Sequence, residues 1–217
     1  MRYDAVVFDN DGVLTTPTER GALRRAIEDA FAEVGVADAT AEDVETLLAP
    51  TVEGLEGVAD ARGVDPTALW DARERAAIDV QAEAIRAGRK TLYEDVAALE
   101  GLSVPRAIVS NNQHETIGTI VDHFGLEDFS PWYGREPTIE GIERKKPRPH
   151  YVERAIGDLG AKNPLYVGDS RVDIEAAAAC GIDSAFIRRS HREGYALSRA
   201  PTHEIDSLEA IPSLLSR

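Results

Sequence analysis

The apolar residues of the chain fall into short continuous runs separated by stretches with helical spacing. Residues 3–8 form a short run with two valines and a phenylalanine, which predicts a buried strand. Further strands are predicted at 106–109, 165–167 and 184–187. Helices are predicted between and after them, at 94–99, 115–124, 150–159, 173–180 and 207–215. This alternation predicts an α/β fold with a parallel sheet covered by helices on both faces.

One long stretch, residues 16–88, interrupts the alternation and carries only helical patterns. Thr16, Pro17 and Glu19 predict a helix start, because they match an N-cap, a proline at the first helical position and a capping box. Three more helices follow, with starts expected at Thr40 (with Asp43), near Val52, and at Asp65 (with Pro66). We therefore expect a helical insert of about four helices that ends near Gly88.

Polar side chains follow three of the predicted strands. They are Asp9 and Asp11 after the first, Ser110 and Asn111 after the second, and Asp169 and Asp173 after the third. A lysine pair, Lys145-Lys146, lies in the loop-like stretch 143–149. The carboxyl ends of neighbouring parallel strands meet at one edge of a sheet, so these groups are expected to converge. Four crowded carboxylates need a cation, and hard oxygen ligands favour Mg²⁺.

The spacing of Asp9 and Asp11 suits phosphoryl transfer. A carboxylate can attack a phosphoryl group and form an acyl phosphate. A carboxylate two residues away lies on the same face of an extended segment. It could protonate the leaving oxygen and then deprotonate the water that hydrolyses the intermediate.

These clusters, in this order, resemble the four motifs of the haloacid dehalogenase superfamily. The matching segments are 6–14 (VVFDNDGVL), 108–111 (IVSN), 146–149 (KPRP) and 167–173 (VGDSRVD). The resemblance covers essentially the whole chain. It implies a Rossmann-like core made of residues 1–15 and 89–217, with a helical cap made of residues 16–88.

The resemblance also implies a role for each site residue. Asp9 is the expected nucleophile, Asp11 the general acid and base, and Lys146 the group that orients the nucleophile and neutralises phosphate charge. Ser110 and the main chain at Asn111 are expected to bind the phosphoryl group. The expected Mg²⁺ ligands are Asp9, Asp11 (through its main-chain carbonyl), Asp169 and Asp173. Asn10 replaces a usually apolar residue, and its side chain is expected to point away from its two neighbouring aspartates.

The favoured function is hydrolysis of a small phosphomonoester, as in the similar phosphoglycolate and sugar-phosphate phosphatases. Asp11 argues against the dehalogenases, which lack an acid/base aspartate there, and a helical cap favours small substrates. A phosphomutase of the β-phosphoglucomutase type would use the same core residues. A catalytically idle relative with a binding or regulatory role is a third alternative, although every expected catalytic side chain is present. A two-component receiver domain also gathers aspartates, a hydroxyl and a lysine around Mg²⁺. That class is disfavoured, because its chain is about half as long and has no helical insert.

The charge of the chain limits its partners. Thirty-nine acidic residues against 24 basic ones give a net charge of -15, which repels nucleic acid and anionic membranes. A site for a phosphorylated metabolite must therefore supply local positive charge or a metal. Lysine occurs only four times, and this acidic, lysine-poor composition favours a halophilic source in which salt screens the repulsion.

Other features of the composition bound the setting of the protein. The single cysteine, Cys180, allows no internal disulfide, and no signal peptide or membrane span is predicted, which fits a cytoplasmic protein. We expect a monomer or a small homo-oligomer. Lys145 is expected to be a surface residue, and Trp70 a packing residue.

Overall fold

Six parallel strands form one sheet in the computed structural model, which describes residues 2–216. The strand order is β3-β2-β1-β4-β5-β6. The strands are β1 (Ala5–Phe8), β2 (Arg106–Gln113), β3 (Phe129–Arg135), β4 (Pro164–Gly168), β5 (Asp183–Ile187) and β6 (His203–Ile205). The central strands are short runs of fully buried residues, as expected for a sheet covered on both faces.

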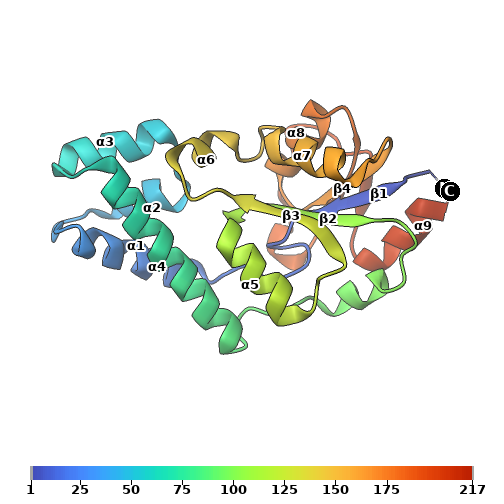
Figure 1. Ribbon diagram of the computed structural model, residues 1–217, viewed down its shortest axis with the longest axis horizontal. Helices are drawn as coiled ribbons and strands as arrows, with labels where there is room; N and C mark the ends of the chain where they lie inside the picture. Colours follow the sequence, from blue (N-terminus) through green and yellow to red (C-terminus); the bar gives the residue numbers. More distant parts are fainter. Residues whose placement is uncertain (1, 217) are drawn as a thin grey trace.

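Helices cover both faces of this sheet (Figure 1). Side chains alternate along β1, so that Val6 and Phe8 pack towards one face and Val7 towards the other. The first face is covered by α5 (His114–Phe124), α9 (Ile211–Ser216) and the 3₁₀ helices η1 (Glu94–Leu99) and η3 (Leu208–Ala210). The second is covered by α7 (His150–Leu159) and α8 (Arg171–Ala179). The predicted α/β class is therefore confirmed.

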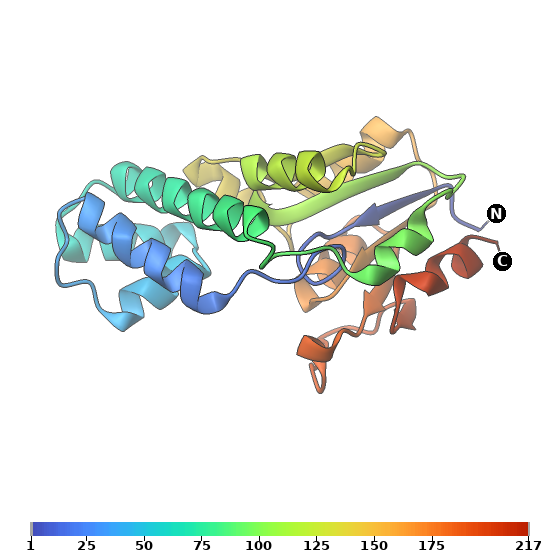
Figure 2. The same cartoon turned by 90° about the horizontal axis from the view of Figure 1, so that it is seen from below.

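Four helices form a cap with an apolar core of its own, beyond the carboxyl ends of the strands (Figures 1 and 2). They are α1 (Arg20–Glu33), α2 (Ala41–Leu48), α3 (Val52–Arg62) and α4 (Pro66–Arg86). The short helix α6 (Ile139–Arg144) adds Ile142 to this cap core. Trp70 is buried there, and its indole N–H donates to the carbonyl oxygen of Pro137 at 3.2 Å.

The expected helix starts are confirmed except for the first. Thr40 and Asp43 exchange capping-box hydrogen bonds, and the Asp65 carboxylate accepts from the N–H of Ala68. Thr16 was wrongly predicted to cap a helix, since α1 begins only at Arg20. The main-chain N–H of Thr16 instead donates to the carbonyl oxygen of Thr91, and its hydroxyl accepts from the N–H of Thr91. Residues 16 and 91 therefore belong to paired connections between cap and core.

Some elements differ from the sequence-based prediction. Strand β2 continues four residues past Val109, because its end pairs with β3 through a register shift. Strand β3, strand β6 and helix α6 were not predicted. The stretch 94–99 is a 3₁₀ helix, and 207–215 contains η3 followed by α9. Among residues 2–216, no helix combines the length and the apolar character that crossing a membrane requires.

Candidate active site at the carboxyl edge of the sheet

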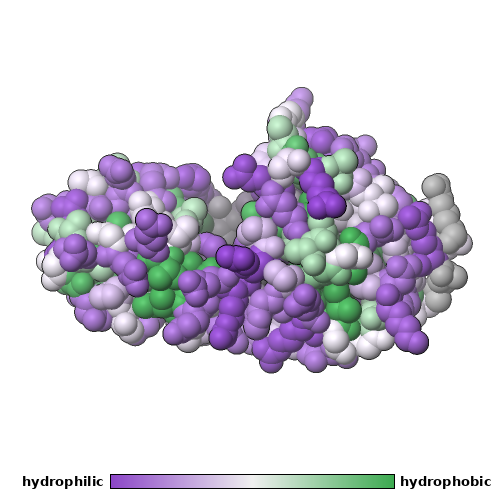
Figure 3. Space-filling view, turned by 90° about the horizontal axis from the view of Figure 1, so that it is seen from above, coloured by the Kyte–Doolittle hydropathy of each residue, from purple (hydrophilic) through white to green (hydrophobic). Residues whose placement is uncertain are grey.

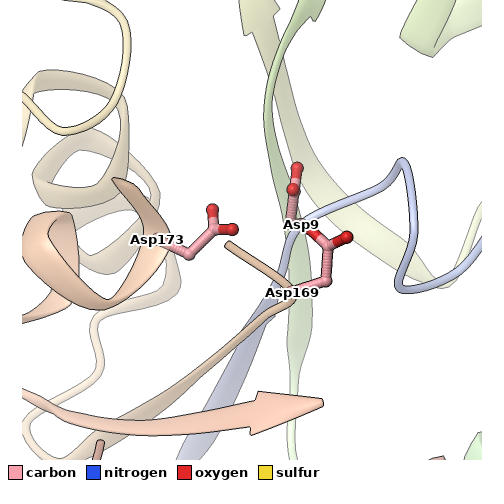
Figure 4. Close-up of side chains that lie close together, drawn as sticks. All are labelled: Asp9, Asp169 and Asp173. Atoms are coloured by element: carbon pink, nitrogen blue, oxygen red, sulfur yellow. The ribbon is translucent and has the colours of Figure 1, made fainter. Parts of the chain in front are cut away.

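Three buried aspartates meet where strands β1 and β4 end. Asp9 follows β1, Asp169 follows β4, and Asp173 lies in the first turn of α8. The parallel pairing of Phe8 with Val167 brings the ends of the two strands side by side. Ligand atoms from the three carboxylates all lie within 4.8 Å of one another, and Figure 4 shows them around a common space. The predicted convergence of these two motifs is observed.

Lys146 lies against this cluster and is itself buried. Its ammonium is 2.9 Å from Asp9 Oδ1 and 2.7 Å from Asp173 Oδ1. It also donates to the carbonyl oxygen of Val109 at 2.9 Å and contacts the Tyr166 hydroxyl at 2.8 Å. Four contacts fix this ammonium, and Tyr166 is a member of the cluster that sequence reasoning missed.

Asn111 positions the Lys146 loop through its side chain. Its amide donates to the Lys146 carbonyl oxygen at 2.9 Å and accepts from the Lys146 N–H at 2.7 Å. Ser110 is buried, and its hydroxyl oxygen accepts from the N–H of Asn112 at 3.2 Å. Phe8 pairs with Ile108, so Asp9 lies at the level of Val109. Ser110 therefore lies one residue beyond Asp9 in the strand direction.

The electrostatics show an excess of negative charge at this point. Burial raises the pKa of Asp9 most, the attraction of Lys146 opposes it, and the repulsion of Asp173 and Asp169 adds to it, so that the pKa reaches about 8. Burial opposes the charge of Lys146, but the two aspartates outweigh it and hold the lysine pKa well above its usual range. Lys146 faces two of the three buried carboxylates, Asp9 and Asp173, and the oxygen donor set of the three suits a hard divalent cation.

Asp173 serves the helix and the cluster at the same time. Its Oδ2 accepts from the main-chain N–H of Ser170 at 3.0 Å and so closes the start of α8, while Oδ1 faces Lys146. A side chain at position 168 would block this arrangement, since a Cβ on Gly168 would lie 2.2 Å from the Asp173 Cβ. Asp173 therefore takes part both in the capping box of α8 and in the carboxylate cluster.

Asp11 lies apart from the three-carboxylate cluster. Its two oxygens are held separately, Oδ1 by the Lys90 ammonium and Oδ2 by the Asn112 amide at 2.8 Å. Lys90 is 1% exposed and also donates to the carbonyl oxygen of Thr16 at 3.0 Å. The Asn10 side chain turns away and donates to the Thr15 hydroxyl at 3.0 Å, as expected. Lys90 was not predicted to belong to the site, although it lies directly where the helical insert returns to the core.

Two basic residues contact Asp169 from the segment after β5. His191 Nε2 lies 2.7 Å from Asp169 Oδ2, and Arg192 Nε donates to the same oxygen at 2.9 Å. Both belong to η2 (Ser190–Arg192). Sequence reasoning missed them, but a signal exists: the basic run 188–192 directly follows a strand at the edge where the site lies.

A cavity of about 400 Å³ lies between the cap and this edge. Figure 3 shows a notch between the two lobes of the molecule. Asp11 lines the cavity on the core side and Gln81 of α4 on the cap side. The cavity is also lined by three cationic side chains, Arg73, Arg135 and Lys145. Lys145 is half-buried there, so its predicted surface position is wrong.

The model of the haloacid dehalogenase-like hydrolases matches residues 3–181. The chain belongs to this family. A phosphoglycolate phosphatase of Pectobacterium atrosepticum is 30% identical over 201 residues, which cover 88% of this chain and 83% of that protein. One of Yersinia pestis is 29% identical, covering 96% and 94%. The protein is thus a phosphatase of the haloacid dehalogenase type, a phosphoric monoester hydrolase.

Solved structures share the fold. The structure of CbbY from Rhodobacter sphaeroides in complex with phosphate superposes with a TM-score of 0.72 at 18% identity, covering 96% of both chains. The α/β core and the helical cap agree with the fold implied by the sequence resemblance.

Proposed function

We propose that the protein is a Mg²⁺-dependent phosphatase that hydrolyses a small phosphomonoester through an aspartyl-phosphate on Asp9. The observation that carries the proposal is the buried Asp9 carboxylate, held 2.9 Å from the Lys146 ammonium beside Asp169 and Asp173. The similarity to phosphoglycolate phosphatases supports phosphoglycolate or a sugar phosphate as the kind of substrate. Residues 16–88 would act as the cap that closes over a core of residues 1–15 and 89–217.

Asp9, Asp169 and Asp173, with the main-chain carbonyl of Asp11, are the proposed Mg²⁺ ligands. The fit rests on the geometry and chemistry of the donor set, because ligand oxygens from Asp9, Asp169 and Asp173 all lie within 4.8 Å of one another. When bound, the ion would neutralise charge on the transferring phosphoryl group. Lys146, 2.9 Å from Asp9, holds that carboxylate in place and adds positive charge there.

The reaction takes two displacements at phosphorus. In the first, an Asp9 oxygen bonds to phosphorus while the bond to the ester oxygen breaks, and that oxygen takes a proton from Asp11. In the second, a water oxygen bonds to phosphorus while the bond between phosphorus and the Asp9 oxygen breaks, Asp11 receives the water proton, and inorganic phosphate leaves with Asp9 restored as a carboxylate. Ser110 and the main chain at Asn111 would bind the phosphoryl oxygens during both steps. Asp11 suits proton transfer because Lys90 and Asn112 fix its two oxygens at the wall of the cavity.

The test is phosphate release from a panel of small phosphomonoesters, with and without Mg²⁺, in dilute and in molar KCl. Release should require Mg²⁺ and should fall by at least about a thousandfold in Asp9→Asn. Asp122→Asn removes the same charge from an exposed position of α5 and should leave the rate unchanged. Borohydride reduction during turnover should convert position 9 to homoserine, which peptide mass spectrometry detects.

Phosphate release by Asp9→Asn at the wild-type rate would refute the nucleophile assignment. A phosphomutase of the β-phosphoglucomutase type remains the alternative, since it would use the same core residues. It would return the phosphoryl group to a sugar, so isomerised sugar phosphate would accumulate without inorganic phosphate. Binding without either reaction would indicate a catalytically idle relative.

A further inference from the structure

Three cationic side chains line the cavity that Asp11 also borders. Arg73 comes from cap helix α4, Arg135 from the end of β3, and Lys145 from the residue after α6. The arginines are 7% and 3% exposed, and Lys145 is half-buried. In a chain of net charge -15, this concentration of buried positive charge is unexpected and calls for a physical explanation.

One carboxylate neutralises only part of this charge. Glu74 accepts from Arg73 Nη1 at 2.6 Å, and both of its oxygens accept from Arg135 Nη2 at 2.8 Å. Both arginines also lie over the Trp70 ring, so packing and ion pairing account for their burial. Three cations around one carboxylate leave an excess of positive charge.

Lys145 has no such explanation. Its ammonium donates to a neutral acceptor, the carbonyl oxygen of Pro50, and within residues 2–216 no carboxylate forms an ion pair with it. Burial, together with the nearby Arg135 and Arg73, lowers its pKa to about 8. A half-buried ammonium beside two guanidinium groups costs free energy unless an anion occupies the space in front of it.

The position of Lys145 separates this charge from the phosphoryl site. Lys145 is extended, and the neighbouring Lys146 contacts Asp9 and Asp173 while Lys145 lines the cavity. A substrate with its phosphoryl group at Asp9 would pass Asp11 and direct its other end into this cavity. The second cation cluster is therefore placed to contact the distal end of the substrate.

We propose that Lys145, with Arg73 and Arg135, binds a second anionic group of the substrate. The substrate class is then phosphomonoesters that carry either a carboxylate or a second phosphate at the far end. This inference rests on the proposed function, because it assigns the distal half of the same substrate. Lys145 acts as a specificity-determining residue. The negative charge of the rest of the chain repels larger polyanions and so disfavours them as substrates.

Matched substrates test the proposal. Phosphoglycolate carries a distal carboxylate, ethanediol bisphosphate a distal phosphate, and 2-hydroxyethyl phosphate has nearly the same length with a neutral end. Wild-type kcat/KM should favour one of the two anionic substrates over the neutral one by at least about tenfold. The preferred anion identifies which of the two groups the cavity takes.

Variants of Lys145 then measure how much this residue contributes to the ratio of kcat/KM for the anionic substrate to kcat/KM for the neutral one. Lys145→Gln should lower the anionic-to-neutral ratio of kcat/KM by about ten- to a hundredfold, mainly through KM. Lys145→Arg keeps the charge and should retain most of the ratio. Lys162→Gln is the matched control, because it removes an exposed lysine at the opposite edge of the sheet and should leave the ratio unchanged. A purely structural role for Lys145 would slow both substrate types equally.

Two outcomes keep this inference separate from the proposed function. If wild type releases phosphate equally well from all three esters, the second-anion site is wrong and the phosphatase assignment stands. If no ester is hydrolysed, calorimetric binding to Asp9→Asn still decides the matter. Tighter binding of an anionic ester than of 2-hydroxyethyl phosphate, lost in Asp9→Asn/Lys145→Gln, supports the site, and equal binding overturns it.

Discussion

At the scale of single residues, the centre of the site combines buried charges of opposite sign that do not cancel. Lys146 bridges Asp9 and Asp173, while Asp169 is contacted by Arg192 and His191. Such groups are expensive to bury, and removing one partner changes the cost for the others. This coupling leads to two predictions about individual side chains.

The first concerns stability and pH in the absence of a divalent cation. The folded chain holds a proton on Asp9 far more tightly than the unfolded chain does, since the pKa rises from 3.8 to about 8. The stabilising contribution of that proton is complete below pH 4 and is lost as the pH rises towards 8. Asp9→Asn carries no titrating group there, so its advantage over wild type should grow with pH.

Thermal unfolding in EDTA at pH 5 and pH 8 tests this. At pH 8, Asp9→Asn should unfold at least about 3 °C above wild type, and the difference should shrink at pH 5. Added Mg²⁺ should stabilise wild type more than the variant. Asp122→Asn should show no pH-dependent difference, and a wild type that gains stability between pH 5 and 8 relative to Asp9→Asn would contradict the argument.

The second residue-scale prediction concerns Lys90, a positioning residue that acts through Asp11. Lys90→Met should lower kcat/KM for an alkyl phosphate by about tenfold or more, because Asp11 loses the ammonium that holds it. The loss should be smaller for p-nitrophenyl phosphate, whose leaving group needs no proton. Equal losses for the two esters would indicate damage to the fold instead, and Lys162→Met provides the surface control.

At the scale of elements, α4 joins the cap to the core. Its residue Gln81 exchanges hydrogen bonds with the Asn112 amide at 2.7 and 2.9 Å, and its residue Glu74 pairs with Arg135 of β3. Both residues are buried on the same face of α4, and their contacts join this helix to the ends of β2 and β3. Through Gln81 and Asn112, hydrogen bonds connect this helix to Asp11.

Glu74→Gln should destabilise the protein by about 3–5 kcal/mol, because it leaves Arg73 and Arg135 buried without their shared carboxylate. Glu83→Gln, on the same helix, breaks only the exposed pair with Arg89 and should change the free energy of unfolding by less than about 1 kcal/mol. Urea unfolding measures both. Similar values for the two variants would show that the Glu74 network contributes no more than a surface pair.

The elements also show how far the sequence predicts this structure. Helix α4 was predictable because Asp65 and Pro66 provide local start signals. Strand β3 was missed, since Ser130, Pro131 and Gly134 are typical of a turn, and only pairing with β2 makes the segment a strand. The false helix start at Thr16 arose because the same residue types also suit a connection, and pairing with Thr91 decides between them.

Among the site residues, too, those with a local sequence signal are predictable and those that meet only through packing are not. The carboxylates and Lys146 follow strand ends or fall in short motifs, so the order of the motifs predicts their convergence. Arg73 and Arg135 carry no such signal, because they meet only when α4 packs across the end of β3. Residues that choose the substrate therefore depend on how the cap packs against the core, which no local pattern of this chain records.

At the scale of the whole molecule, the net charge of -15 opposes folding through long-range repulsion, and salt should relieve it. Exposed pairs such as Arg75–Glu33 and Arg89–Glu83 weaken in salt, but each contributes at most about 1 kcal/mol. The Debye length falls from about 10 Å at 0.1 M to about 3 Å at 1 M, so repulsion among many charges is lost over the same range.

Thermal midpoints should therefore rise by several degrees from dilute buffer to molar KCl. Tetramethylammonium chloride should act similarly if screening is the cause, whereas sucrose at equal osmolality should give less. A midpoint that falls steadily with KCl would contradict both this balance of charges and the halophilic source that the composition favours.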